Sequence, residues 1–455
     1  MLIRFSVENF LSFKDRIYFS MLPGKGTLKK EHKTEAVKGV RVLKVGVAFG
    51  ANASGKSNLI KAIAFGKRLV VEGVSAGGQM DYPKFKLDTE SASKQSRFEY
   101  ELQAGGKNYA YGFVLNEDMV TEEWLYEISK VGETKIYERL VNSFDISYLI
   151  EQQKNDEQKQ FIQFFCKSTP KNQLFLHEVM VRNVKDNVYD IKDLENVLGW
   201  FSNTLNIIFP HDKYKSGIKL IATDNEKLKN YYSALLRYFD TGIKSISLQS
   251  VKSNKTDLPN DVLEQIKREL IKSNNKDTHF SLINGRDNYI LSLKDDKLHI
   301  QKLMTQHAVT GNEQGVYFET GDESDGTNRM IDYIPLLIDL LKGNKIFIID
   351  EMERSLHPNL IYDIFDLYLS NCTNINSQLI VSTHESSLLT QKLLRKDEIW
   401  FVIKDRQGAS MLYSLEDYNV RFDKEIRKDY LLGRYKGVPR LGNRSDIETL
   451  IHKSE

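Results

Sequence analysis

The segment GANASGKSNLIKAI, residues 50–63, constrains the fold of this chain more than any other stretch. It follows an apolar run, Val42 to Phe49, whose pattern predicts a buried strand, and it continues into a helical pattern from Asn58 to Leu69. Its glycines let the backbone wrap around an anion so that successive N–H groups point inward. A strand, a glycine-rich turn and a helix in this order predict a phosphate-binding loop in an α/β fold.

The pattern of this loop is G-x-x-x-x-G-K-S. We expect the Lys56 ammonium to reach the β- and γ-phosphates of a nucleotide, and the Ser57 hydroxyl to bind Mg²⁺. The helix that begins near Gly55 directs the positive end of its dipole at the same anion. A chance match of a glycine-rich turn is disfavoured by the strand and helix on either side. The predicted nucleotide contacts are Gly50, Asn52, Ser54, Gly55, Lys56, Ser57 and Asn58.

Composition narrows the class of protein. The 455 residues, 41% apolar and 28% charged, are typical of a globular chain of two or three domains. The net charge of +2 means that any nucleic-acid surface would have to be local. Two cysteines, Cys166 and Cys372, argue against a disulfide framework or a zinc site and for a reducing compartment. Because charged residues interrupt every apolar stretch, we expect no signal peptide, no membrane span and a cytoplasmic location.

Local patterns predict the order of elements along the chain. Alternation at residues 2–7 and 16–21 predicts an initial hairpin, and Phe98 to Glu127 predicts an antiparallel β-meander. Lysine- and glutamate-rich helical patterns then dominate to about Asn275, without the sustained heptads of a long coiled coil. The segments FSLING, NYILSLK and KLHIQKLM predict further strands.

Two carboxylates end the apolar segment KIFIIDE, residues 345–351. We expect Asp350 to hold Mg²⁺ beside the phosphate loop, and Glu351 to polarise the attacking water as a general base. Acidic residues often end a buried strand merely because they are solvated there. The presence of a phosphate loop in the same chain favours the catalytic interpretation.

A histidine follows another apolar segment, QLIVSTHES, residues 378–386. His384 at the carboxyl end of that strand could hydrogen-bond a γ-phosphate and the attacking water. A single histidine after a strand is commonly incidental. Its position one strand–helix–strand unit after Asp350 favours a role in the site.

The segment ESDGTNRM, residues 323–330, is a glycine-containing turn that opens a helix. Ser324, Gly326 and the helix N-terminus form a second anion-binding surface. One nucleotide cannot easily use two such surfaces of one chain. We therefore predict a dimer in which the turn of each subunit caps the ATP of the other.

The order of these motifs resembles the ATPase heads of the ABC type in the SMC, RecF and Rad50 branch. The segments MLIRFSVENFLSFKD, GANASGKSNLIKAI, E-S-D-G-T-x-R, IDEMERSLHP and STHES together resemble the bacterial AAA15 family of ABC-like ATPases, over roughly residues 1–70 and 320–455. The resemblance implies an ABC-type head, a mixed sheet with a phosphate-loop core plus an antiparallel β-subdomain, interrupted by a mostly helical insertion lobe. The implied domains are a first half of the head at 1–130, the lobe at 131–300, a second half at 301–420 and a basic tail at 421–455.

The resemblance also implies residue roles. Lys56 and Ser57 correspond to phosphate and Mg²⁺ ligands, and Asp350 and Glu351 to the metal-binding and catalytic carboxylates. His384 corresponds to the switch histidine. The signature turn that acts on a second subunit corresponds to Ser324, Asp325, Gly326 and Thr327, and the inter-subunit loop to Ser355–His357. Leu11 stands where many relatives have arginine, which removes one basic contact.

By this resemblance the chain is an ATP- and Mg²⁺-dependent sensor or regulator of a phage-defence (abortive-infection) system of the PARIS, RloA-like or AbiL type. Such ATPases assemble as dimers or higher oligomers and control a Toprim-like or RloB-like nuclease encoded nearby, with a phage protein as a possible class of trigger. A RecF- or Rad50-like repair ATPase that binds DNA is the alternative. Near-neutral charge and the absence of long coils and of a C-x-x-C hook weigh against it. A transporter subunit fits less well, because the head is interrupted and lacks membrane segments.

Two segments carry open interpretations. The 131–300 lobe could contact a partner or trigger, or could serve as a structural lid. The tail gathers basic residues with Tyr430 and Tyr435, and could dock an acidic protein or track nucleic acid. It could also simply pack on the head with Leu431, Leu432 and Val438 inward. The basic residues are Arg421, Lys424, Arg427, Lys428, Arg434, Lys436, Arg440 and Arg444.

Overall fold

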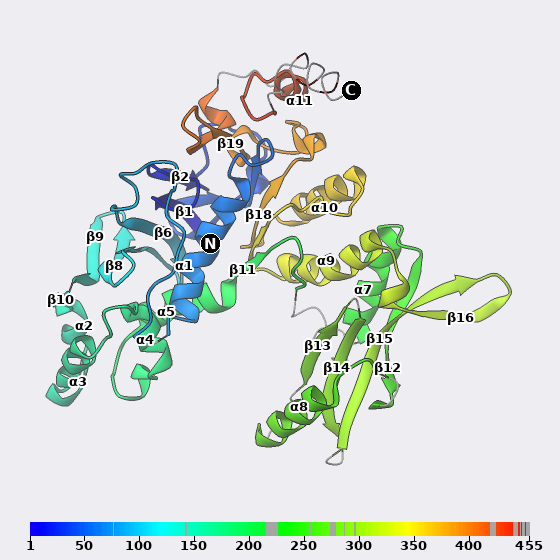
Figure 1. Ribbon diagram of the computed structural model, residues 1–455, viewed down its shortest axis with the longest axis horizontal. Helices are drawn as coiled ribbons and strands as arrows, with labels where there is room; N and C mark the ends of the chain where they lie inside the picture. The colour runs from blue at the N-terminus through cyan, green and yellow to red at the C-terminus, as the bar shows by residue number, and fades with distance from the viewer. Residues whose placement is uncertain are drawn as a thin grey trace. The chain divides into compact units, whose positions relative to one another are not determined.

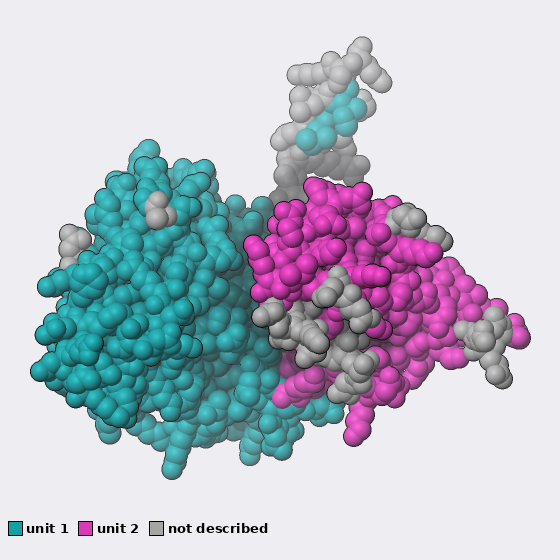
Figure 2. Space-filling view, turned by 90° about the horizontal axis from the view of Figure 1, so that it is seen from below, with its two compact units in different colours: residues 1–210, 343–352, 365–455 teal, residues 211–342, 353–364 magenta. Residues whose placement is uncertain are grey.

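The chain forms two compact units, coloured separately in Figure 2. The computed structural model describes residues 1–75, 77–141, 143–214, 226–253, 256–273, 279–285, 287–294, 297–418 and 425–439, with single residues 445, 447 and 451. Unit 1 comprises Met1–Pro210, Gly343–Met352 and Phe365–Glu455, and unit 2 comprises His211–Lys342 and Glu353–Ile364. The chain thus leaves unit 1 after Pro210, whereas the sequence analysis placed the interruption at 131–300.

A mostly parallel sheet in unit 1 carries the phosphate loop. Its strand order is β11-β17-β18-β5-β19-β20, and β20 alone runs antiparallel to its neighbour. Strands β5 and β17 are apolar and buried along their whole length, as expected when both faces of a parallel sheet are covered. The bounds are β11 (Leu205–Ile208), β17 (Ile346–Ile349), β18 (Gln378–Thr383), β5 (Val45–Phe49), β19 (Ile399–Lys404) and β20 (Ser410–Ser414).

An antiparallel sheet forms the second layer of unit 1, in the order β10-β9-β8-β7-β6-β1-β2. It confirms the predicted hairpin, which is β1 paired with β2, and the predicted meander, which is β6 to β8. The bounds are β1 (Leu2–Glu8), β2 (Ile17–Ser20), β6 (Ser96–Ala104), β7 (Lys107–Leu115), β8 (Val120–Ser129), β9 (Gly132–Leu140) and β10 (Ser143–Asp145).

Helix α1 (Lys56–Val71) packs between the two sheets of unit 1 (Figure 1). Its apolar residues share one buried cluster with Phe5 of β1 and Ile380 of β18. The Tyr100 hydroxyl of β6 donates to the carbonyl of Ile63 at 3.0 Å. Because α1 is fixed on both faces, the phosphate loop at its N-terminus has a rigid support.

Gln378 joins the two sheets where β18 begins. It is fully buried, and its Oε1 accepts from Leu2 N at 2.6 Å. Its Nε2 donates to the carbonyls of Leu2 and Leu43, each at 2.9 Å. This amide therefore satisfies backbone groups of β1 and of β4 (Val40–Leu43), which pairs with β3 (Lys33–Val37).

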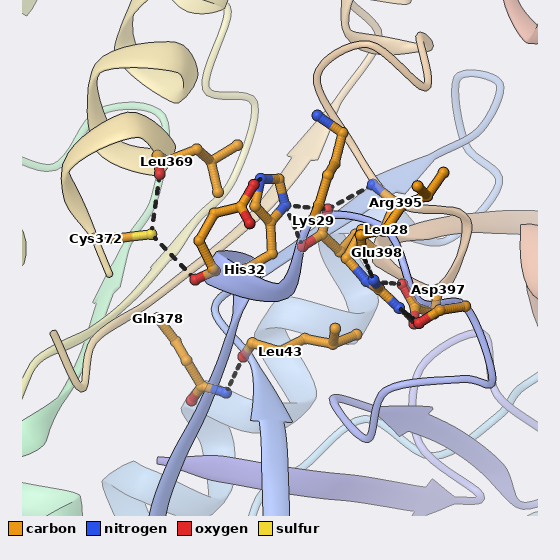
Figure 3. A network of polar contacts seen from close by, with 12 residues as sticks. Leu28, Lys29, His32, Leu43, Leu369, Cys372, Gln378, Arg395, Asp397 and Glu398 are labelled. Carbon is orange, nitrogen blue, oxygen red and sulfur yellow. Dashed lines mark hydrogen bonds and ion pairs between the residues drawn. The ribbon is translucent and has the colours of Figure 1, made fainter. Parts of the chain in front are cut away.

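A buried polar network fixes the start of β19, the strand beside β5 (Figure 3). Glu398 is fully buried and its Oε1 lies 2.9 Å from Nδ1 of the buried His32. Burial raises the pKa of the Glu398 carboxyl. Arg395 forms two hydrogen bonds with Asp397, at 2.6 and 2.8 Å, and Asp397 accepts from Gly24 N. The loop before β3 is thereby attached to the turn before β19.

Short helices follow β10 in unit 1, namely α2 (Ser147–Glu151), α3 (Asp156–Lys167), α4 (Phe175–Val181) and α5 (Lys192–Gly199). Glu123 of β8 holds α4 in place. Its buried carboxylate accepts from the backbone N–H groups of Phe175 and Leu176 at 2.6 and 3.1 Å. The hydroxyls of Tyr111 and Tyr137 donate to the same carboxylate at 3.2 and 2.8 Å.

Replacing Glu123 by alanine is expected to lower the free energy of unfolding by about 3 kcal/mol, because four buried donors lose their acceptor. Urea unfolding followed by far-UV circular dichroism measures the loss. Glu122→Ala is the matched control, since the Glu122 side chain is 42% exposed and pairs with Arg97 at 3.3 Å. Equal, small effects of the two substitutions would contradict the assigned role of Glu123.

Unit 2 is a sheet with helices rather than a mainly helical lobe. Strands β12-β15-β14-β13 form the sheet and β16 adds to β15, all antiparallel. Leu263, Ile266 and Leu270 of α8 cover it. The predicted strands at FSLING, NYILSLK and KLHIQKLM are confirmed, whereas β12 was missed because serines and lysine separate its apolar residues. The bounds are α7 (Glu226–Tyr238), β12 (Ile243–Val251), α8 (Asn260–Lys272), β13 (Phe280–Asn284), β14 (Asp287–Lys294), β15 (Lys297–Val309), β16 (Asn312–Glu319) and α9 (Asp325–Lys342).

The tail packs on unit 1 through its aromatic residues. Tyr430 of α11 (Ile426–Leu431) and Tyr435 are buried and stack on Phe401, with ring centroids 5.8 and 4.9 Å apart. In the interpretation in which the tail packs on the head, Leu431, Leu432 and Val438 point inward. This is wrong for the two leucines, which are 58% and 65% exposed, whereas Val438 is partly buried. The tyrosine rings supply the apolar contact in place of the leucines, because they stack on the ring of Phe401. The predicted basic residues Arg421, Lys424, Arg440 and Arg444 lie outside the described residues.

Helix α10 (Pro358–Asn371) contains residues of both units. No helix of the described residues combines the length and the apolar character needed to span a membrane.

Candidate functional site

The phosphate loop joins the end of β5 to the start of α1, as the sequence predicted. The Lys56 ammonium donates to the carbonyls of Gly50 and Ala51 at 2.8 and 3.0 Å, so it lies over the loop. Gly55 has φ +112°, and a Cβ there would lie 2.2 Å from Ser410 Oγ. A Cβ on Gly50 would lie 2.4 Å from the carbonyl of Val402. Both glycines are therefore required by close packing against β19 and β20 as well as by the turn itself.

Two serines that were not predicted, Ser12 and Ser410, brace the phosphate loop through hydrogen bonds. Ser410 Oγ lies 2.6 Å from the carbonyl of Ser54 and 2.7 Å from Ser12 Oγ. Asn58 was predicted to contact the nucleotide. Its Nδ2 instead donates to Ser12 Oγ at 2.8 Å. Ser12 lies within MLIRFSVENFLSFKD, a segment that resembles the family, and this resemblance could have indicated its role. No pattern around Ser410 indicates a role for that residue.

Two further predicted loop contacts, Asn52 and Ser54, differ in their surroundings. Asn52 is exposed at the middle of the loop. Ser54 is 5% exposed, and its Oγ has no hydrogen-bond partner among the described residues. A buried hydroxyl without a partner is costly unless something else satisfies it. It would suit an oxygen of a phosphate held in the loop.

Asp350 lies directly beside the phosphate loop. Its Oδ1 accepts from Ser57 Oγ at 3.1 Å and from Ser382 Oγ at 2.5 Å. The side chain is almost fully buried, and its backbone N–H donates to Ile208 O at 2.9 Å. A carboxylate and a hydroxyl at this separation are the oxygen donors that Mg²⁺ takes from a protein when phosphate and water complete its shell. The residues present therefore fit the metal that the sequence predicts.

Glu351 adopts a backbone conformation that few residues other than glycine adopt, with φ +48°. Its N–H donates to Ser382 Oγ at 3.0 Å, and the Met352 N–H donates to Ser382 O at 3.2 Å. Ser382 thus fixes the backbone at Glu351 while its hydroxyl bonds Asp350. Such a conformation persists only where the surrounding structure enforces it, and residues of this kind cluster at active sites. Ser382 lies in the quoted segment STHES, but its role was not predicted.

The strand order brings His384 to the same edge of the sheet. In β18, Val381 pairs with Ile349 of β17 and Thr383 pairs with Phe49 of β5. His384 follows Thr383 immediately and is exposed. The carboxyl ends of three adjacent parallel strands thus present Asp350 and Glu351, His384 and the phosphate loop. Ligands of open α/β sheets bind at this edge.

The signature turn lies in unit 2. Ser324 Oγ accepts from the Thr327 N–H at 3.1 Å and lies 2.8 Å from Thr327 Oγ1, so Ser324 caps α9. Ser324 and Asp325 are exposed. A Cβ on Gly326 would lie 2.8 Å from the carbonyl of Ser355, which itself has φ +63°. The structure thus brings the predicted signature residues together with Ser355, on a different unit from the phosphate loop.

Comparison with known families agrees with this geometry. Residues 49–172 and 180–390 match the family described as "AAA domain, putative AbiEii toxin, Type IV TA system". The two stretches make up more than half of the chain. The chain belongs to this AAA domain family. It is therefore a member of an ATPase family, and such a family implies ATP as ligand, typically with Mg²⁺.

Solved structures with some similarity to this AAA domain protein include two SMC heads. A crystal structure of an SMC head bound to the C-winged helix domain of ScpA has 13% identity and a TM-score of 0.39, covering 91% of this chain and 97% of that chain. An SMC head domain from Thermotoga maritima has 11% identity and a TM-score of 0.36, covering 91% and 98%. No curated protein matches this chain.

Proposed function

We propose that this chain is an ABC-type ATPase that regulates an abortive-infection defence system, working as a composite-site dimer or higher oligomer that controls a partner nuclease. The observation that carries the ATPase assignment is the contact of Ser57 with Asp350, next to the constrained Glu351. It joins the phosphate loop to a metal-binding carboxylate and a general base on one sheet edge.

Each step of hydrolysis falls to a residue of this edge. Lys56 and the loop N–H groups hold the phosphates, while Ser57 and Asp350 would hold Mg²⁺, which supplies neutralisation of phosphate charge when bound. Glu351 accepts the proton of the attacking water while the water oxygen bonds to the γ-phosphorus. The bond from that phosphorus to the β–γ bridging oxygen breaks, and ADP leaves. His384 donates a hydrogen bond to the γ-phosphate.

The composite arrangement is supported by the signature turn. An exposed helix N-terminus with the hydroxyls of Ser324 and Thr327 is suited to bind phosphate oxygens. In this proposal the turn of one subunit contacts the γ-phosphate bound by another, so ATP joins subunits and hydrolysis releases them. The family description names an abortive-infection toxin system, which supports the defence context. The nuclease partner rests on the resemblance of the motifs.

The partner is tested by co-purifying the chain with the product of the neighbouring gene, which this proposal takes to be the nuclease, with and without ATP. We expect the amount of nuclease retained to depend on ATP, and to lose that dependence in the Lys56→Ala variant, because the loop then no longer binds the phosphates. Double-stranded DNA is added in parallel ATPase assays. Stimulation by DNA with no retained nuclease would favour the repair ATPase instead.

A further inference from the structure

One carboxylate attaches the signature turn to the sheet of unit 2. Glu323, the residue before Ser324, directs its Oε1 to Thr305 Oγ1 at 2.5 Å and to His307 Nε2 at 2.7 Å. Thr305 and His307 stand two residues apart on β15, so they point to the same face of the strand. The Glu323 side chain is only 9% exposed. The turn is therefore held by a side chain that is directed into the sheet.

The backbone on the N-terminal side of the turn is also fixed. Asn328 Nδ2 lies within hydrogen-bond distance of the carbonyls of Thr320, Glu323 and Ser324, at 2.8, 3.1 and 3.2 Å. Asp287 of β14 accepts from the Gly321 N–H at 3.1 Å and pairs with Lys302 of β15 at 2.7 Å. Side chains of β14 and α9 thus hold the backbone on both sides of Glu323.

We infer that Glu323 is a positioning residue for the composite ATP site. Through Thr305 and His307 it presets the N-terminus of α9, so that the turn need not be ordered when it meets the phosphate bound by another subunit. Donors that are fixed before the reaction stabilise charge without a cost of reorganisation. This inference rests on the proposed function, and it assigns Glu323 no contact with the nucleotide.

The decisive comparison is Glu323→Ala against Glu323→Gln. Both hydrogen bonds end on one oxygen, Oε1, and a glutamine retains that acceptor. We expect Glu323→Ala to lower kcat about tenfold, with the affinity of the phosphate loop for a fluorescent ATP analogue unchanged and a small fall in melting temperature, because Thr305 and His307 lose their acceptor. Glu323→Gln is expected to restore kcat to near the wild-type value. Glu264→Ala is the matched control, an exposed carboxylate on α8 of the same unit.

A second set of variants removes the same bonds from the other side. The double variant Thr305→Val, His307→Ala is expected to lower kcat as much as Glu323→Ala does. Adding Glu323→Ala to it should cause little further loss, because the residues act as one group. This variant also provides the test should Glu323→Ala fail to fold.

Several results would overturn the inference. Wild-type kcat in Glu323→Ala would show that the turn needs no anchor. A glutamine variant as inactive as the alanine variant would show that the negative charge itself is used. Parallel loss of ATP affinity and melting temperature would show a structural role alone. If Lys56→Ala and Ser324→Arg subunits fail to restore activity when mixed, the composite site is wrong and this inference fails with it. If the mixture is active but Glu323→Ala also hydrolyses ATP at the wild-type rate, only this inference is wrong.

Discussion

Replacing Glu351 by glutamine is expected to lower kcat for ATP hydrolysis by about 10²–10⁴-fold, the usual contribution of a general base. Glutamine has nearly the same shape but cannot accept the proton of the attacking water. Asp350 and Ser57 keep their contact, so Mg²⁺ and ATP should still bind. The variant should therefore accumulate in the ATP-bound, associated form. Single-turnover hydrolysis and size-exclusion chromatography with ATP measure the two effects.

Two further variants show whether Glu351→Gln impairs the hydrolysis step rather than nucleotide binding. Lys56→Ala should weaken nucleotide binding itself and show no ATP-dependent association. Ser382→Ala removes the hydroxyl that bonds Asp350 and the Glu351 N–H, so it should reduce kcat less than Glu351→Gln does. A wild-type rate in Glu351→Gln would rule out Glu351 as the base and direct attention to His384.

Mixing two inactive variants is expected to restore activity. Lys56→Ala lacks a working phosphate loop, and Ser324→Arg places a large cation on the signature turn. If the turn acts on the ATP of another subunit, each site combines the loop of one subunit with the turn of its neighbour. In a random equal mixture about a quarter of these sites have both parts intact, in a dimer and in a closed ring alike. ATPase activity of the co-refolded mixture should therefore reach about a quarter of the wild-type rate.

The control for this mixture is Lys56→Ala combined with Glu351→Gln. Both substitutions affect the side of the site that carries the phosphate loop, so no combination of the two subunits gives an intact site, and activity should stay at the background. Restoration in the control as well would contradict the assignment of loop and base to one subunit. A wild-type rate in Ser324→Arg alone would contradict the composite arrangement.

The parts of the site that lie within continuous sequence could be predicted. The loop, the strand that ends at Asp350 and the strand that ends at His384 each carry a local pattern, and parallel pairing brings their carboxyl ends together. Glu351 was predicted from its position after Asp350, but not its positive φ. That conformation depends on Ser382, a residue of another strand, and no local pattern reports such a contact.

What could not be predicted depends on contacts between distant segments. Ser12 and Ser410 brace the loop from two ends of the chain, and serine is too common for its position to be informative. The 131–300 stretch was predicted to be mostly helical because lysine and glutamate dominate it. Its strand β12 interleaves apolar with polar residues as an exposed sheet does, and the stretch divides between two units. The lysine- and glutamate-rich composition of this stretch did not indicate that the chain leaves unit 1 after Pro210.

The position of β5 in its sheet has a consequence for biosynthesis. Its neighbours are β18 and β19, which the ribosome makes only after all of unit 2 up to Lys342. Until then the strand that leads into the phosphate loop has both edges unpaired, and closing so long a connection is slow. A chain that ends before β17 therefore lacks both Ser410, which braces the loop, and the Asp350 carboxylate, which bonds Ser57. Because a ligand stabilises only the state that binds it, we expect ATP to protect the chain from proteolysis once residues up to Ser410 are present, and to protect shorter chains less.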